Sequence, residues 1–199
     1  MSEESILNET IDVYNDSAAV FAETTNKFDL TPLWDSFISY LPGNRIIDLG
    51  CGAGRDVRHF VERGFSVTGV DLSEELLNYA KRLCSKASFV NADIRHLSFS
   101  NTSFDGVWCC GGIVHMGKTE GVKTLQEAHR ILVSGGVFFL SFKEGTGEIY
   151  QESKTIPGIK KRYVLYAEDE MKQLLTNTGF TLLSITRSEK PWVNVFCQK

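Results

Sequence analysis

Hydrophobic and polar positions switch repeatedly between a strand-like and a helix-like pattern along the chain. Short runs rich in apolar and β-branched residues predict strands at 45–49, 65–70, 87–91, 104–109 and 136–142. Apolar side chains at helical spacing predict helices near 54–63, 74–85, 120–132 and 168–178. Strands that alternate with helices in this way indicate an α/β fold, with a mostly parallel sheet that helices cover on both faces.

The two ends of the chain depart from this alternation. Residues 5–23 predict one long helix, and a second helix is expected near 32–41, because Pro42-Gly43 ends it. Two β-rich runs, 180–187 and 191–198, follow the last helix and can pair as an antiparallel hairpin. We therefore expect one antiparallel strand in the sheet.

The composition narrows the class of protein. At 199 residues, 42% of them hydrophobic, the chain can build one full core but hardly two complete folds. The formal net charge of −4 gives no sign of a nucleic-acid-binding surface, so a nucleic-acid partner is not expected. No apolar run reaches the length of a membrane span, and the acidic N-terminus predicts no signal peptide. The five cysteines form no C-x-x-C pair and have no histidines at metal-ligand spacing, which predicts free thiols, no metal site and a cytoplasmic location.

A glycine-rich turn follows the first predicted strand of the alternating region. Gly50, Gly52 and Gly54 let the backbone bend sharply and approach a ligand closely. In an open α/β sheet, ligands bind at the carboxyl ends of the strands, where this turn is expected to lie. A tight turn without any ligand remains the alternative for the glycines taken alone.

Two carboxylates end the next two predicted strands. Asp71 can accept hydrogen bonds from both hydroxyls of a ribose, and Asp93 can accept one from an adenine amine while Ile94 packs against the ring. Each aspartate alone could instead be a helix cap or a turn residue. Together with the glycine turn, they predict an adenosine pocket across three strand ends.

The spacing of the turn distinguishes between two adenosine ligands. The dinucleotide fingerprint is G-x-G-x-x-G, whereas here the third glycine comes one residue early and Asp48 precedes the turn. A carboxylate at this position opposes a phosphate but suits an ammonium group. The turn therefore favours S-adenosylmethionine (SAM), which has an amino-acid tail and no phosphate, over the cofactor of a dehydrogenase.

These motifs resemble those of the class I (Rossmann-like) SAM-dependent methyltransferases, within which the chain is similar to small bacterial-type members. The resemblance is detailed over 43–142 and rests on five segments: 47–54, 67–73, 89–94, 104–110 and 130–136. It implies a three-layer αβα sandwich with seven strands in the order 3-2-1-4-5-7-6, strand 7 being antiparallel. The family often has Pro-Gly-Gly where this chain has Ser134-Gly135-Gly136, a departure that does not affect the cofactor.

The resemblance also implies how the single domain, 1–199, is organised. We expect an N-terminal helical cap at 1–42, a SAM-binding core at 43–142, and a lid or substrate segment with the C-terminal helix and hairpin at 143–199. The cofactor is S-adenosyl-L-methionine and the product S-adenosyl-L-homocysteine (SAH). The expected cofactor contacts are Asp48, Gly50, Cys51, Gly52, Gly54, Asp71, Leu72, Asp93, Ile94 and Cys110.

Two residues are candidates for a role in catalysis. His115 follows the fourth strand and fits a general base by its ordinary pKa, although a pocket-wall or capping histidine is the alternative. Tyr14 lies on the N-terminal helix and could contact the SAM carboxylate or simply pack in the core. Arg55 and Asp56, at the start of the helix after the turn, are interpreted as a structural ion pair.

The stretch 143–166 is longer than a simple connection requires. Its Lys143, Arg162, Tyr163 and Tyr166 could line a substrate pocket or lid, and a solvated loop is the alternative. From Arg162 to Trp192 the tail distantly resembles tRNA wobble-uridine methyltransferases, but the acidic balance argues against that substrate. We therefore expect methyl transfer to an O, N, S or C nucleophile of a small molecule. A tRNA or protein methyltransferase that needs a partner, or a non-catalytic SAM-binding scaffold, are the alternatives.

Overall fold

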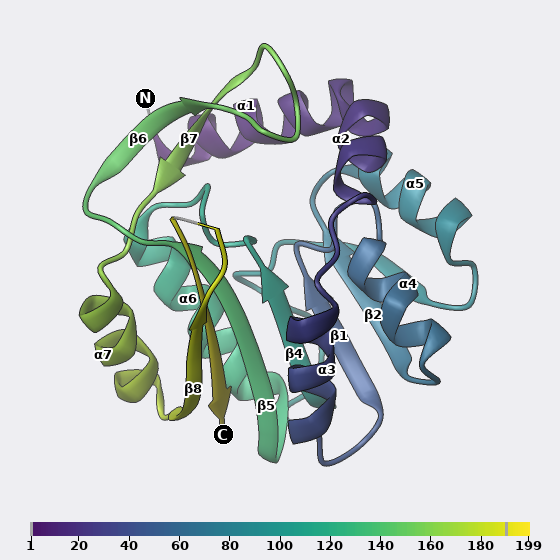
Figure 1. The fold of residues 1–199 in the computed structure, drawn as a ribbon, viewed down its shortest axis with the longest axis vertical. Coiled ribbons are helices and arrows are strands. Elements are labelled where there is room, and N and C mark those ends of the chain that lie inside the picture. Colours follow the sequence, from purple (N-terminus) through teal and green to yellow (C-terminus); the bar gives the residue numbers. More distant parts are fainter. Residues whose placement is uncertain (1, 190) are drawn as a thin grey trace.

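The computed structural model describes residues 2–189 and 191–199, and its centre is a seven-stranded sheet (Figure 1). The strands lie in the order β3-β2-β1-β4-β5-β9-β8. Their bounds are β1 Arg45–Leu49, β2 Ser66–Asp71, β3 Ser88–Asn91, β4 Phe104–Cys110, β5 Leu132–Lys143, β8 Thr181–Arg187 and β9 Trp192–Gln198. Neighbours from β3 to β5 are parallel, and β9 is antiparallel to both β5 and β8. Because two further strands form a separate sheet, β8 and β9 are the sixth and seventh of the main sheet, and the expected order 3-2-1-4-5-7-6 is confirmed.

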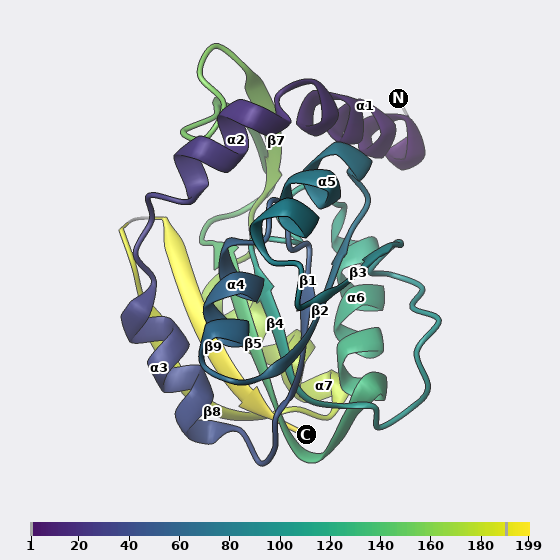
Figure 2. The same cartoon turned by 90° about the vertical axis from the view of Figure 1, so that its right-hand side faces the viewer.

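Helices cover both faces of this sheet, which makes three layers (Figure 2). Their bounds are α3 Thr31–Tyr40, α4 Arg55–Glu62, α5 Glu74–Leu83, α6 Lys118–Ile131 and α7 Glu168–Thr178. Adjacent residues of β1 serve opposite faces: Ile46 packs in the apolar cluster under α3 and α4, and Ile47 in the cluster under α6 and α7. The continuous apolar runs of the central strands thus reflect a sheet that is buried on both sides.

A cap lies over the end of the sheet where the parallel strands finish (Figure 2). It consists of α1 (Glu3–Asp16), α2 (Ala18–Thr25) and a two-stranded antiparallel hairpin of β6 (Glu148–Glu152) and β7 (Lys160–Val164). None of the described helices is long and apolar enough to cross a membrane.

The prediction of one helix over 5–23 was wrong, and the alternative of a solvated loop over 143–166 does not hold. The single helix predicted over 5–23 is broken at Ser17, because Asn15, Asp16 and Ser17 are poor helix formers and the Asn15 side chain is engaged by Ser73 instead. The stretch 143–166 is not a loop, because it contains the hairpin. In β6 every side chain is exposed, so the strand lacks the alternation that would have revealed it.

Candidate functional site

The glycine turn between β1 and α4 is tied to β2 by its backbone. The amides of Gly50 and Cys51 both donate to the Val70 carbonyl, at 2.8 and 3.0 Å. Gly52 has a φ of +52°, and a Cβ there would lie 3.0 Å from the Phe21 ring of α2. Glycine is therefore required both by the backbone conformation and by the closeness of the cap.

Asp71, the last residue of β2, holds this turn in place. Its Oδ2 accepts from the amide of Gly52 at 2.8 Å, and its Oδ1 from the amide of Ser73 at 2.9 Å. Burial raises the pKa of Asp71 despite these hydrogen bonds. Each carboxylate oxygen can accept a further hydrogen bond, so Asp71 could receive two neighbouring hydroxyls of a ligand.

Asp48 lies beneath the turn in β1 and is 1% exposed. Its Oδ2 has no hydrogen-bond partner among the described residues. Burial raises the pKa of Asp48 well above its ordinary value, and the charge of Asp56 adds to the effect. A buried acceptor without a donor is costly, and a ligand ammonium is the kind of group that would satisfy it.

Asp93 and Ile94 follow β3 on the other side of Asp71. Both oxygens of Asp93 accept from the Arg95 guanidinium, at 2.5 to 2.9 Å, and Arg95 also donates to Glu120 at 2.7 Å. Burial acts to raise the pKa of Asp93, but the hydrogen bonds from Arg95 outweigh it and lower the pKa. Asp93 is therefore a firmly ionised acceptor, while Ile94 is buried close to Gly112.

The remaining predicted cofactor residues surround the turn less directly. Cys51 is buried against Gly69, and Leu72 is half-buried after Asp71. The Cys110 sulfur, at the end of β4, lies 3.7 Å from Nη2 of Arg55.

The expected ion pair of Arg55 and Asp56 is present, with a distance of 2.7 Å. The two oxygens of Asp56 also accept from the indole nitrogens of Trp34 and Trp108, at 3.0 and 2.9 Å. The pair thus joins α3, α4 and β4 below the turn and has a structural role.

His115 and Tyr14 meet at the boundary between the cap and the sheet. The Tyr14 hydroxyl lies 2.9 Å from His115 Nε2, and His115 Nδ1 lies 2.7 Å from the Arg162 carbonyl. Because a carbonyl only accepts, Nδ1 carries the proton and Nε2 accepts from Tyr14. Lys161 completes the chain by donating to the Tyr14 oxygen at 2.9 Å.

These contacts set the charge of the group. Burial lowers the pKa of His115 to about 3, and the charge of Lys161 adds to this effect. Burial also raises the pKa of Tyr14. His115 is therefore neutral at physiological pH and a weak base, so its geometry fits the positioning of Tyr14 better than the removal of a proton.

The three predicted substrate residues are not brought together. The Arg162 guanidinium points outward to Glu3 and Glu148, at 2.9 and 2.5 Å, and only its backbone carbonyl faces His115. Tyr163 does lie beside His115, with ring centroids 5.0 Å apart. Tyr166 is 1% exposed and packs in the core against Gly121 and Phe142, away from the others.

Comparison with known proteins finds one protein family whose model matches part of this chain. Residues 46–136, which contain the glycine turn, Asp71 and Asp93, match the family model of a methyltransferase domain. Over these residues, a little under half of the chain, the sequence is therefore similar to a methyltransferase domain.

Several known proteins are similar to the central part of this chain. The methyltransferase YqeM of Bacillus subtilis is 33% identical over 118 residues, which are 55% of this chain and 47% of YqeM. Sterol 24-C-methyltransferase ERG6B of Gibberella zeae is 35% identical over 108 residues, 51% of this chain and 28% of that protein. The chain thus spans half or less of the length of these curated relatives.

A solved structure extends the likeness in fold to nearly the whole chain. The 1,6-didemethyltoxoflavin-N1-methyltransferase of Burkholderia thailandensis superposes with a TM-score of 0.76 at 23% identity, covering 98% of this chain and 88% of that one. That structure was determined with 1,6-didemethyltoxoflavin and S-adenosylhomocysteine bound.

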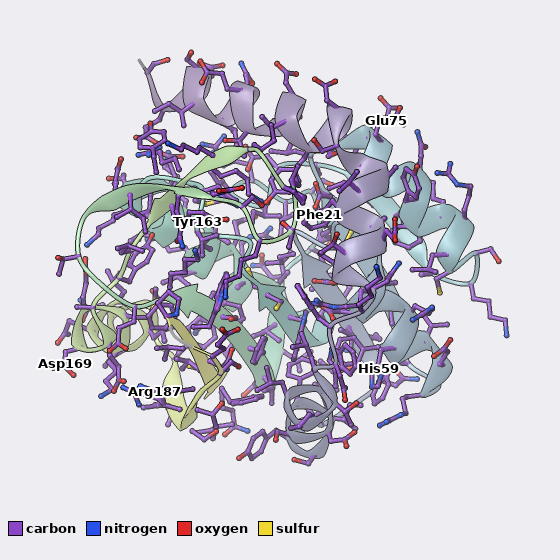
Figure 3. All side chains as sticks on the ribbon, turned by 45° about the horizontal axis from the view of Figure 1, so that its top comes forward. Phe21, His59, Glu75, Tyr163, Asp169 and Arg187 are labelled. Carbon is purple, nitrogen blue, oxygen red and sulfur yellow. The ribbon has the colours of Figure 1, made fainter. Side chains whose placement is uncertain are left out.

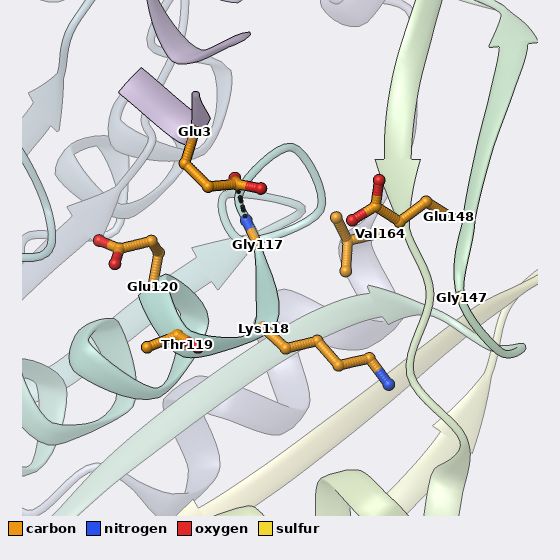
Figure 4. A pocket seen from close by; sticks show the side chains of 8 residues that line it. All are labelled: Glu3, Gly117, Lys118, Thr119, Glu120, Gly147, Glu148 and Val164. Carbon is orange, nitrogen blue, oxygen red and sulfur yellow. Dashed lines mark hydrogen bonds between the residues drawn. The ribbon is translucent and has the colours of Figure 1, made fainter. Parts of the chain in front are cut away.

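The structure also shows a separate hollow of about 380 Å³ at the outer edge of the cap (Figure 4). It is lined by Glu3, Gly117, Lys118, Thr119, Glu120, Gly147, Glu148 and Val164. None of the predicted cofactor residues lines it, and the Gly117 amide donates to Glu3 across it at 3.2 Å. The hollow is therefore distinct from the site at the glycine turn.

Proposed function

We propose that this chain is a methyltransferase that binds SAM at the glycine turn and methylates a small molecule. The observation that carries the proposal is the placement of three acidic residues at the ends of β1, β2 and β3. Asp48 offers an unsatisfied acceptor for the ammonium, Asp71 two acceptors for the ribose, and Asp93 an ionised acceptor for the adenine amine.

The residues of the chain fit the cofactor, whose sulfonium would supply an electrophilic methyl group for an in-line displacement. The glycines of the turn have no side chains where the cofactor would approach the protein backbone, and Ile94 can pack against the adenine ring. Tyr14, held by His115 and Lys161, is placed to orient the amino-acid tail or the acceptor. The cap covers the strand ends and can exclude water during transfer.

Two observations support a small acceptor. The carboxyl end of the sheet is covered by α1, α2 and the hairpin, so an acceptor would bind under this cap (Figure 3). The net charge of −4 does not favour a nucleic acid. Some relatives are named after the acceptor that they methylate. Examples are the malonyl-[acyl-carrier protein] O-methyltransferase of Enterobacter lignolyticus and the sterol 24-C-methyltransferase of Gibberella zeae.

Calorimetry with SAM, SAH and NAD tests the cofactor. We expect SAM and SAH to bind and NAD not to bind, and preferential NAD binding would contradict the proposal. A screen of metabolites with methyl-labelled SAM then tests turnover. SAH binding without transfer to any acceptor would favour a scaffold, and transfer only to RNA or protein would contradict a small-molecule acceptor.

A further inference from the structure

Two lysines, one at the end of β5 and one in the hairpin, are buried and have no carboxylate partner among the described residues. Lys143 ends β5, Lys161 lies in β7, and each is 6% exposed. Neither takes part in an ion pair within residues 2–189 and 191–199. Lys143 donates only to the Gln151 amide oxygen, at 3.3 Å, and Lys161 only to the hydroxyls of Tyr14 and Thr155.

Other buried cations of this chain are paired with carboxylates. Arg55 is held by Asp56, and Arg162 by Glu3 and Glu148. An unpaired charge in the interior is costly, so such a charge usually has a partner. Consistent with that cost, burial lowers the pKa of Lys161 to about 8, and the charge of Lys143 contributes.

Aromatic rings stabilise both lysines only in part. The Lys143 Nζ lies 3.4 Å from the centre of the Tyr163 ring and 5.6 Å from that of Trp192. The Lys161 Nζ lies 6.0 Å from the same Tyr163 ring and 4.5 Å from that of Tyr14. Cation–π contacts of this kind favour a cation but supply no negative charge.

The position of the lysines points to the acceptor side of the site. Tyr163, to which both are close, neighbours His115 after β4, and Trp192 contacts Gly111 at the end of the same strand. The Lys161 Nζ also lies 6.0 Å from the centre of the Phe21 ring, which packs close to Gly52 of the glycine turn (Figure 3). The two ammonium groups are thus beside the glycine turn rather than in it.

We propose that Lys143 and Lys161 bind the anionic group, a carboxylate or phosphate, of an acidic planar methyl acceptor that stacks on Tyr163 and Trp192. This inference rests on the proposed methyltransferase function and names the class of its acceptor. Lys143 is bonded to Gln151 of the hairpin and Lys161 to Tyr14 of α1, so the acceptor reaches them when these parts of the cap move away. Its negative charge then supplies the partner that the protein itself does not provide.

Calorimetry on SAH-saturated protein tests this site with benzoate, phenyl phosphate and the uncharged benzamide. We expect at least one of the two anions to bind and benzamide not to bind. Lys143→Met and Lys161→Met should each weaken anion binding at least tenfold, and Lys143→Met, which does not touch Tyr14, should do so without changing SAH affinity. Lys160→Met, an exposed neighbour in β7, is the matched control and should leave anion binding unchanged.

Each contrary outcome has a distinct meaning. No saturable anion binding, equal binding of benzoate and benzamide, or unchanged affinity in both methionine variants would overturn the acceptor assignment. Weaker SAH binding in these variants with unchanged binding of 5′-methylthioadenosine, which lacks the amino-acid tail, would assign the lysines to the cofactor carboxylate instead. If the wild type does not bind SAH, the methyltransferase proposal is contradicted. The predicted preference of the two lysines for an anion would not be contradicted by that result.

A second measurement is independent of any ligand. If the lysines serve binding rather than folding, their unpaired buried charges lower the stability of the folded protein. Lys143→Met and Lys161→Met should therefore raise the melting temperature of the free protein. Lys160→Met should not change it. A lower melting temperature in both methionine variants would show that the lysines are structural and would overturn the proposal.

Discussion

At the scale of single residues, two buried aspartates of neighbouring elements have opposite surroundings. Asp56 is satisfied by Arg55 and two tryptophans, whereas Asp48 keeps one oxygen without a donor. Full satisfaction fits a structural role for Asp56, and the unmet acceptor of Asp48, next to the glycine turn, is one that a bound ligand could satisfy. The same contrast separates the paired Arg162 from Lys143 and Lys161.

Asp71 allows a direct test of the ribose assignment. Asp71→Ala removes both acceptors and leaves the Gly52 amide unpaired, so we expect SAH to bind at least thirtyfold more weakly, a loss of about 2 kcal/mol. Calorimetry measures this loss. Asp35→Ala, which removes an exposed carboxylate of α3, should leave the affinity unchanged. Equal affinities of the two variants would mean that Asp71 does not hold the ribose.

His115 makes the stability of the protein depend on pH. Its folded-state pKa of about 3 lies below the unfolded value of about 6.5, so below that value the unfolded chain binds the proton more readily. The contribution of the neutral histidine is complete above pH 6.5 and falls as the pH decreases, by about 2 kcal/mol at pH 5. Urea unfolding of the wild type and His115→Gln at pH 7.5 and 5 measures it, because the variant should lack this decrease. Parallel pH dependence of the two proteins would contradict the buried, neutral state.

Some of these site residues could be predicted from the sequence and others could not, depending on how far apart along the chain the contacting residues are. The turn and Asp71 lie within one βα unit, so spacing along the chain reports their proximity. Tyr14 and His115 are 101 residues apart, and Lys161 is 147 residues from Tyr14. No local pattern reports such contacts, so the partners of His115 and the burial of the lysines required the structure.

At the scale of elements, α1 is held by polar contacts rather than by a core. It has no buried residue, and its attachments are Glu3 to Arg162, Tyr14 to His115, and Asn15 to Ser73. A helix with so little buried apolar surface can separate from the sheet without unfolding the rest. We therefore expect α1 to be the part of the cap that moves most readily to admit ligands.

The ion pairs of Arg162 with Glu3 and Glu148 form a clamp between α1 and the hairpin, and its loss should loosen the cap alone. We expect Arg162→Gln to speed amide hydrogen exchange in α1 and the hairpin about tenfold, as a loss of about 1.4 kcal/mol of closing free energy would. Exchange in β1, β4 and β5 should not change. Arg187→Gln, which removes an ion pair to Glu168 outside the cap, is the control. Unchanged exchange in α1 would show that the clamp does not hold it.

At the scale of the whole molecule, the layers were predictable and the hairpin of the cap was not. The alternation of strand and helix patterns from β1 to α7 reports burial on both faces of a sheet, which local periodicity encodes. The cap depends instead on segments from both halves of the chain, and the exposed β6 carries no apolar pattern. Its existence as a hairpin follows from pairing with β7, a tertiary property.

Cofactor binding should stabilise the molecule as a unit. With SAH at a hundred times its Kd, we expect about 2.7 kcal/mol of added stability and a melting temperature about 5–10 °C higher. Scanning calorimetry measures the shift. At the same concentration, 5′-methylthioadenosine should give a smaller shift, because it has no ammonium for Asp48. Equal shifts would mean that Asp48 does not bind the tail.

The clamp between Glu3 and Arg162 also orders events during synthesis. The two residues are 159 positions apart, so the ribosome releases α1 long before its partner strand exists. A contact of such high separation forms late, after the local β–α units have folded. Until then the nascent chain has a glycine turn that α1 does not cover, and the site closes only after the hairpin has been made.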